Sequence, residues 1–162
     1  MKPTAILHAG ASGILALFLA QSLLAQLATK KALTLDAAKK IAAAAEAEAR
    51  KNNFTVVIAI VDDGANLLYL ERMDGTQMGS IEIAQFKARS AAKFKRPTKA
   101  FGDRLTSGEM YLLKVPDLAP FEGGVPIMLG TECIGGIGVS GMTSQQDGVV
   151  AAAALAVASK MQ

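Results

Sequence analysis

One short segment of this sequence combines residue types that can bind a charged ligand. In Arg72-Met73-Asp74-Gly75, the arginine ends a predicted hairpin, where its guanidinium can pair with the carboxylate of a small molecule. A surface ion pair of Arg72 with Asp74 or Glu71, which contributes little to stability, explains the same residues equally well. We therefore treat Arg72 and Asp74 as candidate ligand-binding residues with a structural alternative.

A second candidate lies in a glycine-rich segment near the C-terminal end. Gly123-Gly124-Val125-Pro126-Ile127 and Ile134–Gly141 are apolar runs separated by a turn, which predicts a buried hairpin. Glycine weakens a strand, and the usual reason to keep it is close approach of the backbone to a ligand or another chain. The N–H groups of Gly123 and Gly124 can bind an anion. The alternative is a strained turn that enters the strand at Pro126.

The end of this hairpin supplies one more candidate. Ser140-Gly141 precedes a predicted helix, and a helix N-terminus attracts negative charge. Plain capping by Ser144 and Asp147 is the favoured explanation of these residues. Ser140 nevertheless joins the candidate ligand-binding residues.

Catalytic chemistry finds little support in the sequence. Cys133 is the only cysteine, so no intrachain disulfide can form, and His8, the only histidine, would be lost with a cleaved N-terminal leader, which leaves no Ser-His-Asp set in the mature chain. No spacing of Cys, His and carboxylate is typical of a metal site. We predict no catalytic residues, and we expect Cys133 to be a small buried hydrophobe beside Ile134.

The N-terminal 25 residues have the pattern of a secretory signal peptide. Met1-Lys2 is followed by an apolar run, Ile14–Ala25, that is too short to span a bilayer comfortably. We predict cleavage after Ala25, a periplasmic or secreted mature protein, and no membrane span after cleavage. His8 would be lost with the leader.

Composition predicts one domain over residues 26–162. Hydrophobic residues make up 51% of the chain but aromatic residues only 5%, which suits alanine-rich helices packed on a sheet. The net charge is +3, and the one basic cluster, Lys87–Lys99, contains a single aromatic residue, Phe94, without the aromatic-basic interleaving of nucleic-acid-binding segments. We therefore predict no nucleic-acid partner, and a solvated helix face for Lys87 and Arg89.

Periodicity and turn signals predict an α+β domain, an antiparallel sheet of two hairpins flanked by helices. Helices are expected at 35–51, 80–94, 98–105 and 145–160, because apolar residues recur there at helical spacing between capping residues. The first hairpin, 55–61 and 67–73, surrounds the turn Asp62-Asp63-Gly64-Ala65-Asn66. Residues 106–122 are expected to form an irregular loop.

In this order, the motifs resemble those of the GlcG/HbpS family of small, often haem-binding domains, also found as the C-terminal domain of PduO-type proteins. The matching segments span roughly residues 33–160 and are Val61–Leu68, Arg72–Gly75, Ser80–Ala84, Lys87-Ala88, Phe94, Pro97-Thr98, Gly123–Ile127, Gly135–Gly141 and Asp147. Each motif alone is common, whereas the ordered set is specific.

The resemblance implies a homo-oligomer that binds haem or another small ligand, and, in some members, secretion. Methionine, thiolate or tyrosine can hold haem iron, so the methionines, Tyr111 and Cys133 are nominal axial ligands. From this set we take three axial candidates, Met73, Met110 and Tyr111. The leading hypothesis is haem storage, scavenging or sensing outside the cytoplasm. The alternatives are an enzyme or enzyme accessory in catabolism of small oxygenated compounds such as glycolate or diols, and a structural oligomer without ligand.

Overall fold

The computed structural model describes residues 29–160, and those from Ala32 onward belong to one compact unit. The predicted signal peptide, its cleavage point after Ala25, and His8 lie outside the described residues. None of the helices in the described range is both long enough and apolar enough to cross a membrane.

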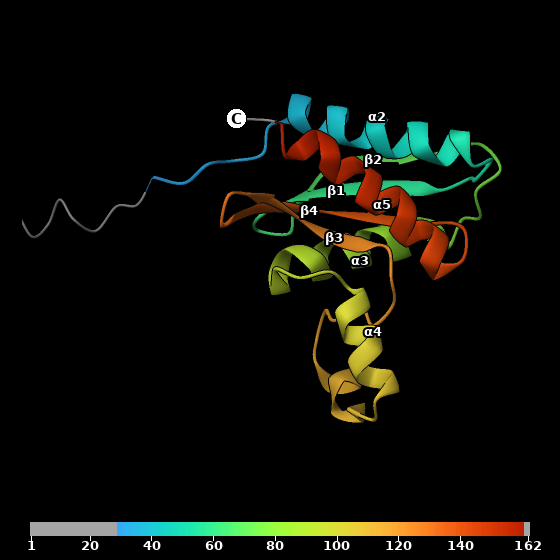
Figure 1. The fold of residues 1–162 in the computed structure, drawn as a ribbon, viewed down its shortest axis with the longest axis vertical. Helices are drawn as coiled ribbons and strands as arrows, with labels where there is room; N and C mark the ends of the chain where they lie inside the picture. Colours follow the sequence, from blue (N-terminus) through green and yellow to red (C-terminus); the bar gives the residue numbers. More distant parts are fainter. Residues whose placement is uncertain (1–28, 161–162) are drawn as a thin grey trace, which may run out of the picture. The chain divides into compact units, whose positions relative to one another are not determined.

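A four-stranded antiparallel sheet forms the centre of the unit (Figure 1). Its strands are β1 (Val57–Asp62), β2 (Leu67–Arg72), β3 (Gly124–Leu129) and β4 (Glu132–Ser140). The order β2-β1-β4-β3 places the two predicted hairpins side by side, joined where β1 pairs with β4. The prediction of an α+β fold with two antiparallel hairpins is therefore confirmed.

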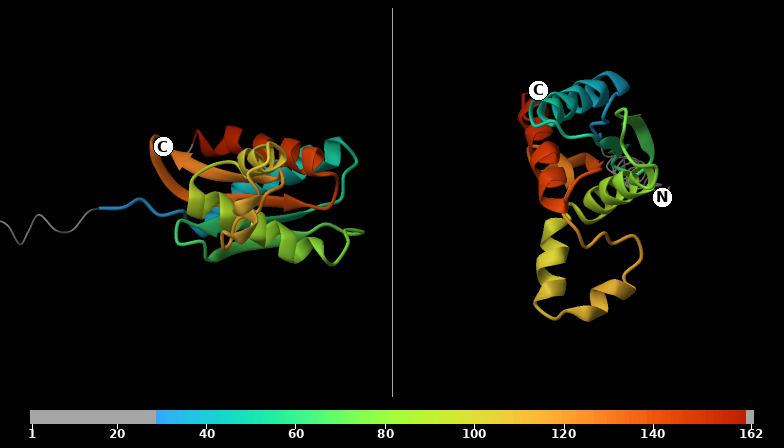
Figure 2. Two further views of the ribbon diagram at one scale, coloured as in Figure 1. Left: turned by 90° about the horizontal axis from the view of Figure 1, so that it is seen from below. Right: turned by 90° about the vertical axis from the view of Figure 1, so that its right-hand side faces the viewer.

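Helices cover both faces of the sheet (Figures 1 and 2). Helices α2 (Leu35–Lys51) and α5 (Ser144–Ala158) pack on one face, and α3 (Ser80–Phe94) packs on the other. Helix α4 (Lys99–Thr106) and the 3-10 helix η2 (Met110–Lys114) form an arm beyond the sheet. Helix η2 lies within residues 106–122, which we expected to form an irregular loop without a helix, whereas α4 matches the helix expected at 98–105.

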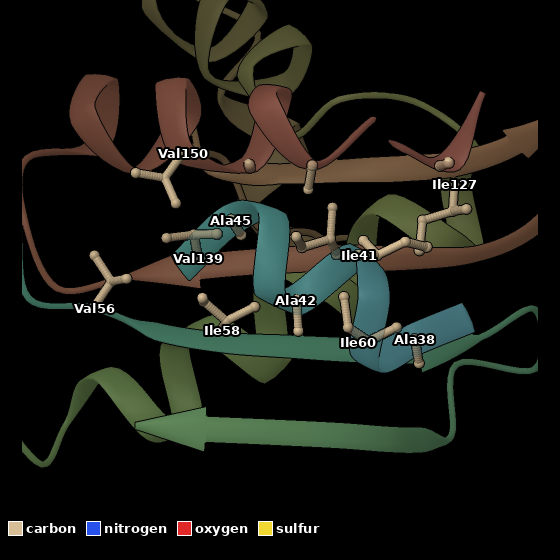
Figure 3. Packing of buried hydrophobic residues seen from close by; sticks show 14 of the residues in the cluster. Ala38, Ile41, Ala42, Ala45, Val56, Ile58, Ile60, Ile127, Val139 and Val150 are labelled. Carbon is tan, nitrogen blue, oxygen red and sulfur yellow. The ribbon is translucent and has the colours of Figure 1, made fainter. Parts of the chain in front are cut away.

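Strand β1 is buried on both faces because its side chains alternate between two apolar layers. Ile58 and Ile60 point to α2 and α5, where they contact the alanine and isoleucine stripe of α2 (Figure 3). Val57, Ala59 and Val61 point to α3. The small side chains of these helices let their backbones approach the sheet closely.

The glycines of β4 make room for α3. A Cβ at Gly136 would lie 2.5 Å from the Ala88 carbonyl oxygen, and one at Gly138 would lie 2.5 Å from the Ala88 nitrogen. Real Cβ atoms do not tolerate such distances from backbone, so a helix can lie here only over glycine. The interpretation that these glycines admit a ligand or another chain is wrong, because the protein's own helix occupies the space.

Candidate functional site

Several predicted site residues meet at one end of the sheet, where β2 and β4 end and β1 and β3 begin. Arg72 pairs in register with Val57, and Val57 pairs with Ser140, so the three form one row across the sheet. Directly paired residues share a face, here the face that α3 covers. Gly123 lies beside this row, since its carbonyl accepts a hydrogen bond from the Val139 N–H, 2.9 Å away.

A surface groove lies at this end, between the end of α2 and the end of β2. One hollow of about 370 Å³ is lined by Arg50, Asn53, Phe54, Thr55, Met73 and Asp74. A second, of about 230 Å³, shares Arg50, Met73 and Asp74 with it and adds Glu46, Glu71 and Arg72. We call the two together the Met73 groove. It joins three predicted residues to Arg50 and Phe54, which were not predicted as site residues.

The cations of the Met73 groove are only loosely held. Arg50 forms an ion pair with Glu46 one helical turn earlier, and its side chain is 66% exposed. Arg72 donates through Nη1 to the Thr76 carbonyl, at 3.1 Å, and to the Met78 sulfur. Within residues 29–160 no ion pair joins Arg72 to Asp74 or Glu71, so the predicted surface pair is not formed.

The three axial candidates differ in their surroundings. Met73 is half-buried, packs against the core and lines the groove. Met110 and Tyr111 lie on η2, with 60% and 57% of their surfaces exposed. The Tyr111 hydroxyl donates a short hydrogen bond to Glu109, which raises the pKa of the phenol, and it also accepts one from Arg104. The phenolate that would hold iron is therefore disfavoured, and Met73 is the best placed of the three.

A buried ion pair, Lys87–Asp147, lies behind the same end of the sheet. The Lys87 Nζ is 2.8 Å from the Asp147 Oδ2, and the two side chains are 2% and 3% exposed. Lys87 also donates to the Val139 carbonyl at 2.9 Å, and Asp147 accepts from the Met142 N–H at 3.0 Å. The pair therefore ties α3, β4 and α5 together.

Burial and pairing act in opposite directions on the two charges. Burial lowers the pKa of Lys87 and raises that of Asp147, while the hydrogen bond between them opposes both shifts. Burial has the larger effect, so the net shift of the pKa is downward for Lys87 and upward for Asp147. An ion pair of this kind links elements of the fold, and removing one partner is costly.

The roles of both residues of the pair differ from those predicted from the sequence. Lys87 was expected on a solvated face, but it lies three residues after Ala84 and four before Ala91, on the buried stripe of α3. That spacing in the sequence could have identified Lys87 as a buried residue. Asp147 and Ser144 were expected to cap α5, whereas Thr143 is the N-cap, in a capping box with Gln146, and Asp147 is free to reach Lys87.

The paired glycines before β3 serve internal contacts. The Gly124 N–H donates to the Thr98 hydroxyl at 2.9 Å, and a Cβ on Gly123 would lie 2.7 Å from the Lys87 Nζ. Gly123 also has φ +118°, a conformation that favours glycine. The two residues thus leave space for Lys87 and Thr98.

The remaining candidate, Ser140, is buried. Its hydroxyl lies 3.3 Å from that of Ser80 on α3, within hydrogen-bond distance. Across the part of the chain that the structure describes, no three His, Cys, Asp or Glu side chains gather as a metal site would require.

The fold and this end of the sheet define a class of protein: a single-domain α+β protein with an open four-stranded antiparallel sheet between α2/α5 and α3. The chain belongs to the HbpS-like family, whose model, described as haem degrading protein HbpS-like, matches residues 33–156. The predicted resemblance is thus confirmed over most of the described residues.

Individual relatives agree with this assignment. Protein GlcG of Escherichia coli K12 is 43% identical over 112 residues, covering 69% of this chain and 84% of GlcG. The crystal structure of HbpS matches with a TM-score of 0.75 and 34% identity, over 82% of this chain and 94% of HbpS. A PduOC–haem complex matches with a TM-score of 0.71 and 27% identity, over 78% and 95% of the respective chains.

Proposed function

We propose that this protein binds haem in the Met73 groove. The observation that carries the proposal is the meeting of a half-buried thioether, an aromatic ring and two arginines in one surface groove. Membership of the HbpS-like family and similarity to a PduOC structure that contains haem support the choice of ligand.

The residues of the groove suit the parts of a haem. Methionine is a known axial ligand of haem iron, and Met73 is the sulfur that this groove offers. Phe54 gives an apolar face to a flat ring, and Arg50 and Arg72 can pair with the propionates. Bound haem supplies redox and ligand-binding chemistry at its iron; the protein supplies the ligand sulfur, the cations and the apolar contact.

The size of the groove supports a proposal about assembly. Ligand pockets typically have volumes of roughly 300–1,000 Å³ and bury most of the ligand. The hollows of about 370 and 230 Å³ lie on the surface of one subunit, so they leave a ligand as large as haem partly uncovered. We propose that the protein is a homo-oligomer, in which a second subunit covers the ligand.

Location and role follow from the predicted leader. A protein exported to the periplasm or the medium and able to bind haem would act in haem storage, scavenging or sensing. N-terminal sequencing of the protein recovered from the periplasm or medium tests this part, with Gln26 as the expected first residue.

A hemin titration followed by absorbance tests the binding proposal. We expect a saturable Soret band, a shift of its position on Met73→Leu, and a loss of affinity of about tenfold, which corresponds to about 1.4 kcal/mol. Met110→Leu is the matched control, because Met110 is an exposed methionine outside the groove. Its titration should be that of the unmodified protein.

A flat, non-saturating response would contradict haem binding itself. Saturable binding with the same spectrum and affinity in Met73→Leu would contradict the assignment to the Met73 groove. Size-exclusion chromatography with light scattering, run on the same samples, tests the oligomer.

A further inference from the structure

A second groove lies on another part of the molecule, where α4 meets the beginning of α5. It has a volume of about 360 Å³. The residues that matter for its chemistry are Lys99 and Asp103 on α4, Phe121 and Glu122 before β3, and Ser144 and Gln145 at the start of α5. We call it the Glu122 groove. It shares no lining residue with the Met73 groove.

A glycine in α5 makes space for the Glu122 side chain. Gly148 lies inside a helix that is otherwise rich in alanine, although glycine is among the least favourable residues in a helix interior. A Cβ at this position would lie 2.7 Å from the Glu122 Cδ, so even alanine would displace the carboxylate. Gly148 therefore allows the Glu122 side chain to lie directly against the backbone of α5.

In the described part of the chain, no hydrogen bond occupies the oxygens of Glu122. Lys87 and Lys99 lie close enough to interact electrostatically with Glu122, and the N-terminal part of α5 favours negative charge. Among residues 29–160 no group donates a hydrogen bond to Glu122, although it is half-buried. An ionised carboxylate only accepts hydrogen bonds, so Glu122 offers acceptor sites to a ligand in the groove.

Most charges near the groove are paired with one another. Lys99 is paired with Asp103 at 2.7 Å, and Lys87, behind the groove, is paired with Asp147. Among the described residues, neither sign therefore forms a cluster that would select a charged ligand. Phe121, whose ring centre is 5.5 Å from the Lys87 Nζ, gives the groove an apolar wall. A neutral molecule with hydroxyl donors and a carbon body fits these conditions.

We propose that the Glu122 groove binds a small neutral polyol or monosaccharide, with Glu122 accepting hydrogen bonds from its hydroxyl groups. The Ser144 hydroxyl and the Gln145 amide can both donate and accept, so they complete the polar side of the groove. A volume of about 360 Å³ suits a ligand of about three to six carbon atoms.

Titration of the ¹⁵N-labelled protein with glycerol, xylose and glucose, followed by NMR, tests the proposal. We expect saturable shifts with at least one of the three, concentrated at the amides of Phe121, Glu122, Ser144 and Gln145. Glu122→Gln should weaken binding about tenfold, because hydrogen bonds to a charged acceptor are about twice as strong as neutral ones. Glu132→Gln, at an exposed carboxylate of β4 outside the groove, should leave the affinity unchanged.

Gly148→Ala separates a role in binding from a role in folding. The alanine favours the helix but displaces the Glu122 carboxylate, so the variant should remain folded and lose affinity to a similar extent. Absence of saturable shifts with all three probes would overturn the proposal, as would equal affinities in Glu122→Gln and Glu132→Gln. Hemin binding by Glu122→Gln should be unchanged, which keeps this test independent of the Met73 groove.

Discussion

The buried ion pair and the Met73 groove lie at the same end of the sheet, yet their polar groups are held differently. Lys87 and Asp147 are almost fully buried, and each bonds both its partner and the backbone. Arg50 and Arg72 are exposed, and each holds only a local contact on its own helix or loop. Charges that are satisfied inside the chain stabilise the fold, whereas exposed charges beside a hollow remain available to a ligand.

The largest effect should come from removing the buried cation. Lys87→Met leaves Asp147 buried without its partner, and such a change typically costs about 3–5 kcal/mol in the free energy of unfolding. The matched change in the groove, Arg72→Met, should cost less than about 1 kcal/mol, because exposed pairs contribute little. Urea unfolding measures both. Equal costs would remove the distinction between the two regions.

A second comparison concerns two glycines next to α3. Gly138 of β4 lies against the middle of the helix, whereas Gly79 precedes it at an exposed position. Gly138→Ala forces a Cβ into the backbone of α3 and should destabilise the protein by about 1–3 kcal/mol, the usual cost of overpacking. Gly79→Ala is the control, since a Cβ there meets nothing within 4 Å. Thermal unfolding of the two variants gives the result, and a stable Gly138→Ala would show that α3 is not held against β4 as described.

The cations of the Met73 groove should have a smaller, salt-dependent effect. Arg50→Gln and Arg72→Gln are each expected to weaken hemin binding by up to about fivefold, the range of an exposed charge pair, and less at high salt. Arg89→Gln changes an exposed arginine of α3 that does not line the groove. Titrations at two ionic strengths test this, and a loss equal to that of Arg89→Gln would mean that the groove arginines do not contact the ligand.

The smallest effect concerns an exposed network on the arm. Hydrogen bonds from Arg104 and Tyr111 lower the pKa of Glu109 to about 2. Because the pKa is lower in the folded state, the stabilising contribution is present above the ordinary value of 4.5 and is lost as the pH falls through about 2. NMR titration of the carboxyl carbon measures the midpoint, and Arg104→Gln should raise it. An ordinary midpoint in the unmodified protein would mean that the network does not form in solution.

Local patterns predicted most of the fold. Helix α2 begins and ends where the sequence indicated, at Leu35 and Lys51, because its N-cap Thr34 is a local signal, and α3 ends at Phe94 as expected. Ser80, expected to cap α3, is instead its first residue, and Gly79 is the N-cap. The pairing of β1 with β4 is a tertiary contact between distant segments, and only the structure reveals it. The short helix η2 was missed in a segment that glycine and prolines divide.

The candidate site was only partly predictable for the same reason. Arg72, Met73 and Asp74 are consecutive, so a local motif identified them, whereas Arg50 and Phe54 reach the groove from the end of α2. Lys87 and Asp147 are 60 residues apart, and no local pattern links them. Side chains that meet across elements can be assigned to one site only when the packing of those elements is known.

One measurement tests the central proposal most directly: NMR of protein labelled with ¹³C at its methionine methyl groups, recorded with and without one equivalent of hemin. Paramagnetic iron strongly shifts or broadens the signal of a methyl group next to it. If haem binds as proposed, the Met73 signal changes most and the Met110 signal stays in place. An unchanged Met73 signal under conditions where hemin is bound would contradict the proposed site.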